Sequence, residues 1–305
     1  MEKRNYRKNR VTAKGLTLDL LSTCGSRAAP VSALIGAAAL FGIADNALRV
    51  ALARLLAEGL VVRNERGRYR LGPTALGMKQ QIVGWRSIEQ RVRPWSGDWI
   101  GVHSGAPRSS AQRAGRAESK RRRPLRLLGF RTLSPGLEIR PDNLVGGVSF
   151  VHARLADLGL GVAIGTEPIV FGMTSLDGDA ESIARKLWDT ERLLGDYLEL
   201  TARLERSAAR LATLSPAAAM RESFELGGEG IRQLVVDPLL PDQIAPANAR
   251  RALLEAMRHY DLLGRRCWAS WLGGESEPEQ LPAGVRAAGI RATRVGGLDP
   301  TDRAA

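Results

Sequence analysis

The residues best suited to chemistry in this chain are four arginines that lie close together. Arg63, Arg66, Arg68 and Arg70 belong to the stretch LVVRNERGRYRLG, in which apolar and charged residues flank a Glu-Arg-Gly turn. This pattern predicts a short β-hairpin. A guanidinium group is a permanent cation, and its planar N–H donors match the oxygens of a phosphate group. The hairpin is therefore expected to face phosphate groups or, in the simpler alternative, only water.

An amphipathic helix is predicted just before the hairpin, with Asp45 as its N-cap and Gly59 ending it. Its apolar stripe consists of leucines at helical spacing, namely Leu48, Leu52, Leu55 and Leu56. The opposite face is small and nearly free of acids, with Asn46, Val50, Ala53 and Ala57 at its centre and Arg49 and Arg54 on its flanks. Such a face can approach a nucleic-acid duplex without repelling phosphate.

Two further helices are predicted upstream, over residues 12–24 and 30–42. Three helices followed by a two-stranded hairpin are the element order of a winged helix-turn-helix, whose third helix enters the major groove. The wing contacts backbone or minor groove, where flexible cations find phosphates without reading bases. The expected DNA contacts are Asn46, Arg49, Arg54, Arg63, Arg66 and Arg68. Winged helices also serve as protein-interaction modules, which is the main alternative.

The distribution of charge favours the nucleic-acid interpretation. The 305-residue chain has a formal net charge of +13, and residues 1–83 and 84–130 contribute +9 and +8, whereas the remainder is at −4. A basic N-terminal part joined to a mildly acidic remainder suggests a nucleic-acid module attached to another domain. The basic segment 104–123 is expected to be a loop that leads into a helix. Two widely separated cysteines, and no leader-like or membrane-spanning apolar run, favour a cytoplasmic protein.

The predicted fold class is α+β, with a winged helix-turn-helix at residues 1–83 and a linker with a ferredoxin-like central domain at 84–179. A β-α-β-β-α-β order underlies the central prediction. A C-terminal helical domain is expected at 180–272 and a disordered tail at 273–305. The longest helix is predicted over 180–212. It carries a near-heptad series, which indicates either a dimer seam or packing within the monomer: Leu187, Leu194, Tyr197, Leu204 and Leu211.

Four blocks of the chain, in order, resemble the PaaX-type transcriptional repressors of phenylacetate degradation. They are the helix-wing block ALIGAAALFGIADNALRVALARLLAEGLVVRNERGRYRL, then GFRTLSPGLEIRP, KLWDTERLLGDY and DPLLPDQIAPANARRALLEA. Together they span roughly residues 12 to 272. The resemblance implies a homodimeric repressor of a catabolic operon, which binds a palindromic double-stranded operator and releases it when an aryl- or acyl-coenzyme A thioester binds.

Arg131 and Arg140 flank the predicted central turn and are the candidates to hold an anionic ligand, such as the phosphates of coenzyme A. Solvated arginines at strand ends are the common alternative. The family's central domain is also similar to a nuclease fold of CRISPR adaptation, which needs an acidic residue at the end of the first strand. Here that strand ends at His103, so nuclease activity is not predicted.

No catalytic or metal-binding residues are predicted. The histidines His103, His152 and His259 belong to separate predicted elements and have no acid or cysteine partner at catalytic spacing. Trp85, Trp95 and Trp99 cluster after the first domain and are expected to pack rather than to line a cleft. Two alternatives to a transcription regulator stay open: an enzyme that processes nucleic acid and docks through the winged helix, and a protein that coats DNA without sequence preference.

Overall fold

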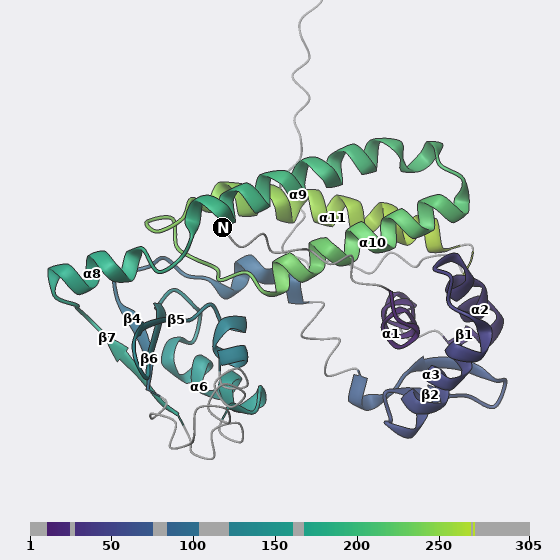
Figure 1. Cartoon of the computed structure of the whole chain (residues 1–305), viewed down its shortest axis with the longest axis horizontal. Coiled ribbons are helices and arrows are strands. Elements are labelled where there is room, and N and C mark those ends of the chain that lie inside the picture. Colours follow the sequence, from purple (N-terminus) through teal and green to yellow (C-terminus); the bar gives the residue numbers. More distant parts are fainter. Residues whose placement is uncertain are drawn as a thin grey trace, which may run out of the picture. The chain divides into compact units, whose positions relative to one another are not determined.

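The computed structural model describes residues 11–24, 28–75, 84–103, 122–160, 168–269 and 271. All of them belong to one compact unit, Met1–Gly274. Most of the basic segment 104–123 and all of the predicted tail, 273–305, lie outside the described residues. The described part combines helices with two antiparallel sheets, which confirms the α+β class (Figure 1).

The N-terminal module, residues 11–75, contains the three expected helices: α1 (Ala13–Thr23), α2 (Val31–Leu40) and α3 (Asp45–Ala57). Thr12 caps α1 by accepting a hydrogen bond from the backbone N–H of Gly15 at 3.1 Å. The apolar faces of the helices meet in a core that includes Leu16, Leu20, Leu34, Leu48, Leu52 and Leu55, each at most 2% exposed. The leucine stripe predicted for α3 is therefore its packing face.

A three-stranded sheet with the order β1-β3-β2 completes this module. β2 (Val61–Arg63) and β3 (Arg68–Leu71) form the predicted hairpin. A further strand that was not predicted from the sequence, β1 (Ala29–Pro30), pairs with β3. A two-residue strand has no periodicity of its own, so only its pairing with a strand about 40 positions away reveals it.

The central part begins with a 3₁₀ segment, η1 (Gly84–Arg91), and contains a four-stranded antiparallel sheet of order β5-β6-β4-β7. Its strands are β4 (Trp99–His103), β5 (Arg131–Ser134), β6 (Leu137–Pro141) and β7 (Ile169–Met173). Residues 122–127 are helical and come between β4 and β5 in the chain, and α6 (Gly147–Asp157) comes between β6 and β7. Along the chain the elements follow the predicted β-α-β-β-α-β order.

The C-terminal part is helical and consists of α8 (Gly178–Arg185), α9 (Thr190–Arg210), η2 (Leu211–Thr213), α10 (Pro216–Val235) and α11 (Ala247–Ala269). Helices α9, α10 and α11 lie alongside one another (Figure 1). The single helix predicted over 180–212 is wrong, because α8 ends before α9 begins. Asp189 starts α9 as its N-cap and accepts from the backbone N–H of Arg192 at 3.1 Å.

The near-heptad residues of α9 pack inside the monomer. Tyr197, Leu204 and Leu211 are at most 4% exposed and belong to one core with residues of α10 and α11, whereas Leu187 lies in the break before α9. Of the two explanations left open by the sequence, the structure favours packing within the chain over a dimer seam. No helix in the described ranges is both long and apolar enough to cross a membrane.

Candidate nucleic-acid interface

Helix α3 presents one exposed face because its leucines face the core. Asn46, Arg49 and Arg54, which were expected to contact DNA, are all exposed. Val50 and Ala53 lie on the same face, and Val50 is 43% exposed. Gly59 closes the helix in the left-handed conformation at φ 66°, where the N–H of Leu60 donates to the carbonyl of Leu55 at 2.9 Å.

The role predicted for Asp45 is wrong. Ala44 is the N-cap of α3 and makes no side-chain capping bond, whereas Asp45 is the first helical residue. One turn further along the helix, Arg49 donates to the Asp45 carboxylate from Nε at 2.7 Å and from Nη2 at 3.3 Å. Both side chains are about half exposed. Such an exposed i,i+4 pair stabilises a helix by only about 0.3–0.5 kcal/mol, so Arg49 can exchange Asp45 for another partner at little cost.

The β2–β3 hairpin turns through Asn64 to Gly67. The Asn64 side chain accepts a hydrogen bond from the backbone N–H of Arg68 at 2.9 Å, and the N–H of Gly67 donates to the carbonyl of Asn64 at 3.0 Å. Gly67 has φ 72°, a region that strains residues with a side chain. The turn therefore has a defined geometry and carries Arg66, which is exposed.

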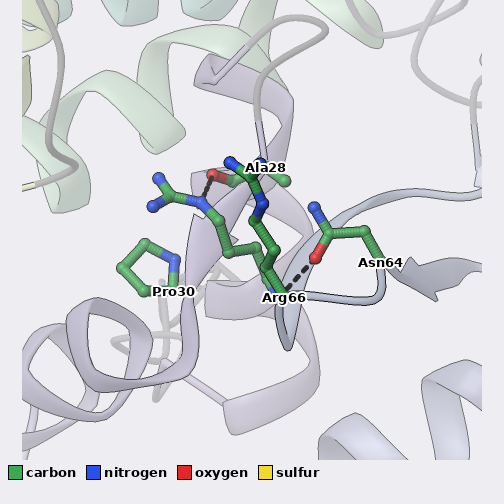
Figure 2. Close-up of a pocket in the computed structure, with 5 residues that line it drawn as sticks. Ala28, Pro30, Asn64 and Arg66 are labelled. Carbon is green, nitrogen blue, oxygen red and sulfur yellow. Dashed lines mark hydrogen bonds between the residues drawn. The ribbon is translucent and has the colours of Figure 1, made fainter.

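A pocket of about 480 Å³ lies between this turn and the segment that precedes α2. It is lined by Ala28, Pro30, Asn64, Arg66 and Arg68. Figure 2 shows Pro30 and Asn64 on opposite sides of Arg66. Both arginines were predicted from the sequence, but the other three lining residues were not, because the pocket depends on the pairing of β1 with β3. Two cations at an open pocket can bind a phosphate group.

The hairpin arginines differ in how far the protein already uses them. Arg68 donates from Nε to the carbonyl of Ala28 at 2.8 Å, and its side chain is half-buried. The Arg63 guanidinium lies over the Tyr69 ring, 5.9 Å from its centroid. Arg66 and Arg70 are exposed, and Arg70 is a further candidate contact that was not among the six predicted ones. Arg68 thus has a structural bond in addition to any contact with a ligand.

The expected ligand role of Arg140 does not agree with its surroundings. Its side chain is 2% exposed and donates to the carbonyls of Leu128 and, at 3.2 Å, Pro141. A third donor reaches Asn143 Oδ1 at 3.1 Å and the Pro238 carbonyl at 3.4 Å. Its guanidinium is occupied by the protein itself, so the predicted ligand role is wrong and Arg140 is a structural cation.

Burial also changes the titration of this arginine. Loss of hydration lowers the pKa of Arg140 to about 9, and the nearby carboxylates of Asp142 and Asp237 oppose that shift. The neighbouring Asn143 donates to the carbonyl of Leu239 at 2.7 Å. Leu239 has the unusual φ of 51°, and its N–H donates to Asp237 at 2.8 Å. Arg140 and Asn143 therefore help to hold an irregular segment that connects α10 to α11.

Arg131 remains a candidate for ligand binding. It lines a cavity of about 160 Å³, whose other lining residues are Arg122, Leu125, Arg126, Phe130, Thr132 and Glu138. Three guanidinium groups near one buried carboxylate give the cavity a positive balance, which suits a small anionic group.

The tryptophans pack as predicted. Across the described ranges, no three side chains of the metal-ligating types come together in a way that could hold a metal ion. Trp85 is 2% exposed in one core. Trp95 and Trp99 pack edge to face in another, with Trp99 stacked on Trp188 at 6.2 Å between ring centroids. These aromatic rings therefore contribute to packing.

No family model and no curated protein matches the chain. Among solved structures, it is similar to the uncharacterized protein Rv0674 from Mycobacterium tuberculosis, with a TM-score of 0.50 and 25% sequence identity. The match covers 83% of this chain and 98% of that chain. This neighbour indicates a shared fold and carries no functional description. The PaaX-type assignment stays a prediction from the sequence blocks.

Proposed function

We propose that this protein is a DNA-binding transcription regulator that uses its N-terminal module as a winged helix-turn-helix. The observation that carries the proposal is the combination, in one module, of the exposed, nearly acid-free face of α3 with the arginine-bearing β2–β3 hairpin. In this class of domain, the third helix reads base edges in the major groove while the wing holds the backbone.

Electrostatics supports the same conclusion. Residues 1–83 have a net charge of +9 within a chain of +13. Cations that neutralise backbone phosphates release condensed counterions, and this release drives binding at low salt. The pocket lined by Arg66 and Arg68 is the expected phosphate site, and Arg63 and Arg54 are expected to add contacts nearby.

Sequence reading is assigned to α3. Asn46 is expected to hydrogen-bond an adenine, and Arg49 a guanine, since these are the pairings that the two side chains form in the major groove. Arg49 must exchange its Asp45 partner for the base. The low cost of breaking an exposed pair makes that exchange favourable once a bidentate base contact is available.

The proposed biological role is that of a homodimeric repressor of a catabolic operon. It rests on the four sequence blocks that resemble the PaaX-type family, which also imply an aryl- or acyl-coenzyme A effector. A ferredoxin-like central domain is expected separately, from the order of its elements. The antiparallel strand order of the central sheet and the positive cavity at Arg131 are compatible with those expectations. A ligand that weakens operator binding must bind the DNA-free form more tightly than the DNA-bound form.

The decisive experiment selects DNA with the full-length chain. Immobilised protein is incubated with a pool of random duplexes, and the retained fraction is amplified and sequenced over several rounds. The proposal predicts enrichment of an inverted repeat whose half-sites lie about one helical turn, roughly 34–36 Å, or a multiple of it apart. Retention without sequence preference would favour a coating protein, and shortened duplexes would favour the enzyme alternative; either result overturns the proposal.

A further inference from the structure

Val50 is an unusual residue for its position on α3. It is 43% exposed, and it is the only residue of the described N-terminal module among the protein's exposed large hydrophobic side chains. Branching at Cβ also makes valine a poorer helix former than alanine. Neither burial nor helix stability explains a valine here.

Short side chains form a small platform around Val50, with arginines at its edges. Ala47 and Ala53 lie one turn away on either side and are exposed, and Asn46 adds an amide to the same face. Arg49 and Arg54 lie at the edges of the platform, and in the free protein Arg49 pairs with Asp45. Because Ala47 and Ala53 are short, Val50 is exposed between them.

A thymine methyl group is the chemical partner that fits such a platform. The C5 methyl of thymine is the one apolar group in the major-groove code, and small apolar side chains recognise it by contact. Because the module is basic, a DNA duplex is the partner that its charge favours. We propose that Val50 is a specificity-determining residue that packs on the methyl group of a thymine in each operator half-site, an inference that rests on the proposed DNA-reading function.

Each half-site is therefore expected to contain an A·T pair at the position that Val50 contacts in the major groove. Asn46 lies one helical turn before Val50, where its amide can reach a neighbouring base pair. Asparagine hydrogen-bonds adenine, and a small apolar side chain contacts the methyl group of thymine. Asn46 and Val50 together therefore favour neighbouring A·T base pairs.

The test uses the duplex enriched by full-length protein from the random pool. Each thymine is replaced in turn by deoxyuridine, which lacks only the methyl group, and affinities are measured by fluorescence anisotropy. At one symmetric thymine position, wild-type affinity should fall roughly fourfold per half-site, as expected from about 0.8 kcal/mol per buried methyl-sized group. The variant Val50→Ala should lose affinity for the thymine duplex and show no further loss with deoxyuridine at that position.

Two controls separate this contact from folding and from general effects. Val50→Ala places a better helix former at an exposed site, so the free energy of unfolding of the variant should not decrease. Val145→Ala alters a valine that is 52% exposed in the central part of the chain, and it should leave both duplex affinities unchanged.

The possible outcomes distinguish this inference from the function on which it rests. The thymine contact is overturned if deoxyuridine lowers the affinity at no position, or if its effect persists in Val50→Ala. Sequence-specific binding would stand in both cases. If the selection enriches no sequence, the DNA-reading function itself fails, and the role of Val50 fails with it.

Discussion

Replacing Arg66 with alanine should weaken DNA binding through a lost phosphate contact and leave folding unchanged. Arg66 is exposed at the hairpin turn and lines the 480 Å³ pocket without the backbone bond that holds Arg68. Each phosphate contact contributes about 0.9 to the slope of log K against log salt. Loss of one contact therefore changes the ratio of wild-type to variant affinity by about 3.5-fold between about 50 and 200 mM salt.

The structure predicts a different result for Arg68→Ala. The salt slope should again fall by about 0.9, but the variant also loses the hydrogen bond to the Ala28 carbonyl, which joins β3 to the segment before α2. Loss of that bond should lower the free energy of unfolding by about 1 kcal/mol. Arg66→Ala should show no such decrease.

Both effects are measurable with the selected duplex and with a random-sequence duplex. Fluorescence anisotropy titrations at four or more salt concentrations give the slope, and urea denaturation gives the free energy of unfolding. Because a phosphate contact reads no bases, both duplexes should lose the same factor. Arg251→Ala, an exposed arginine on α11, is the matched control. A slope unchanged in both hairpin variants would refute the assignment of the hairpin to the DNA backbone.

Three further predictions concern other parts of the chain. Arg49→Ala should weaken binding to the selected duplex by about 1–3 kcal/mol and reduce the difference in affinity between the selected and the random-sequence duplex. If anisotropy shows an equal loss on both duplexes, Arg49 is only a phosphate contact. Arg140→Ala should lower the free energy of unfolding by about 3–5 kcal/mol in urea titrations, because it leaves buried carbonyl and carboxylate groups without their cation; a variant as stable as wild type would contradict the structural role. Calorimetry with a panel of aryl- and acyl-coenzyme A thioesters should find one that binds the free protein more tightly than the operator complex and whose binding weakens in Arg131→Ala; if none binds, the coenzyme A switch is wrong and DNA binding is unaffected.

Much of the N-terminal module could be predicted because its determinants are local. The leucine stripe of α3, the left-handed Gly59 after it and the glycine in the hairpin turn act within a few residues of one another, so periodicity and turn chemistry reveal them. The same holds for the turn between β5 and β6 and for the proline-rich connection before α11.

The predictions that failed depended on distant partners, on a choice between two local partners, or on a helix start that the apolar spacing conceals. Asp45 had two roles available, as a cap or as a partner for Arg49, and only the backbone conformation of Ala44 decides between them. The break between α8 and α9 was hidden because the apolar spacing continues through it, while Asp189 starts a new helix.

The sequence by itself therefore determined the three N-terminal helices, the packing face of α3 and the cationic character of the hairpin, because each depends on residue type and short-range spacing. Only the tertiary structure decided which cations remain accessible. Arg140 and Arg131 flank the same turn in the sequence, yet one is enclosed by carbonyl groups from as far as Pro238 while the other lines a cavity. Likewise, Arg68 is anchored by Ala28, 40 positions away, and Arg66 is exposed. The physical reason is that the cost of burying a charge is offset by hydrogen-bond acceptors from remote segments, and no local pattern encodes where those acceptors lie.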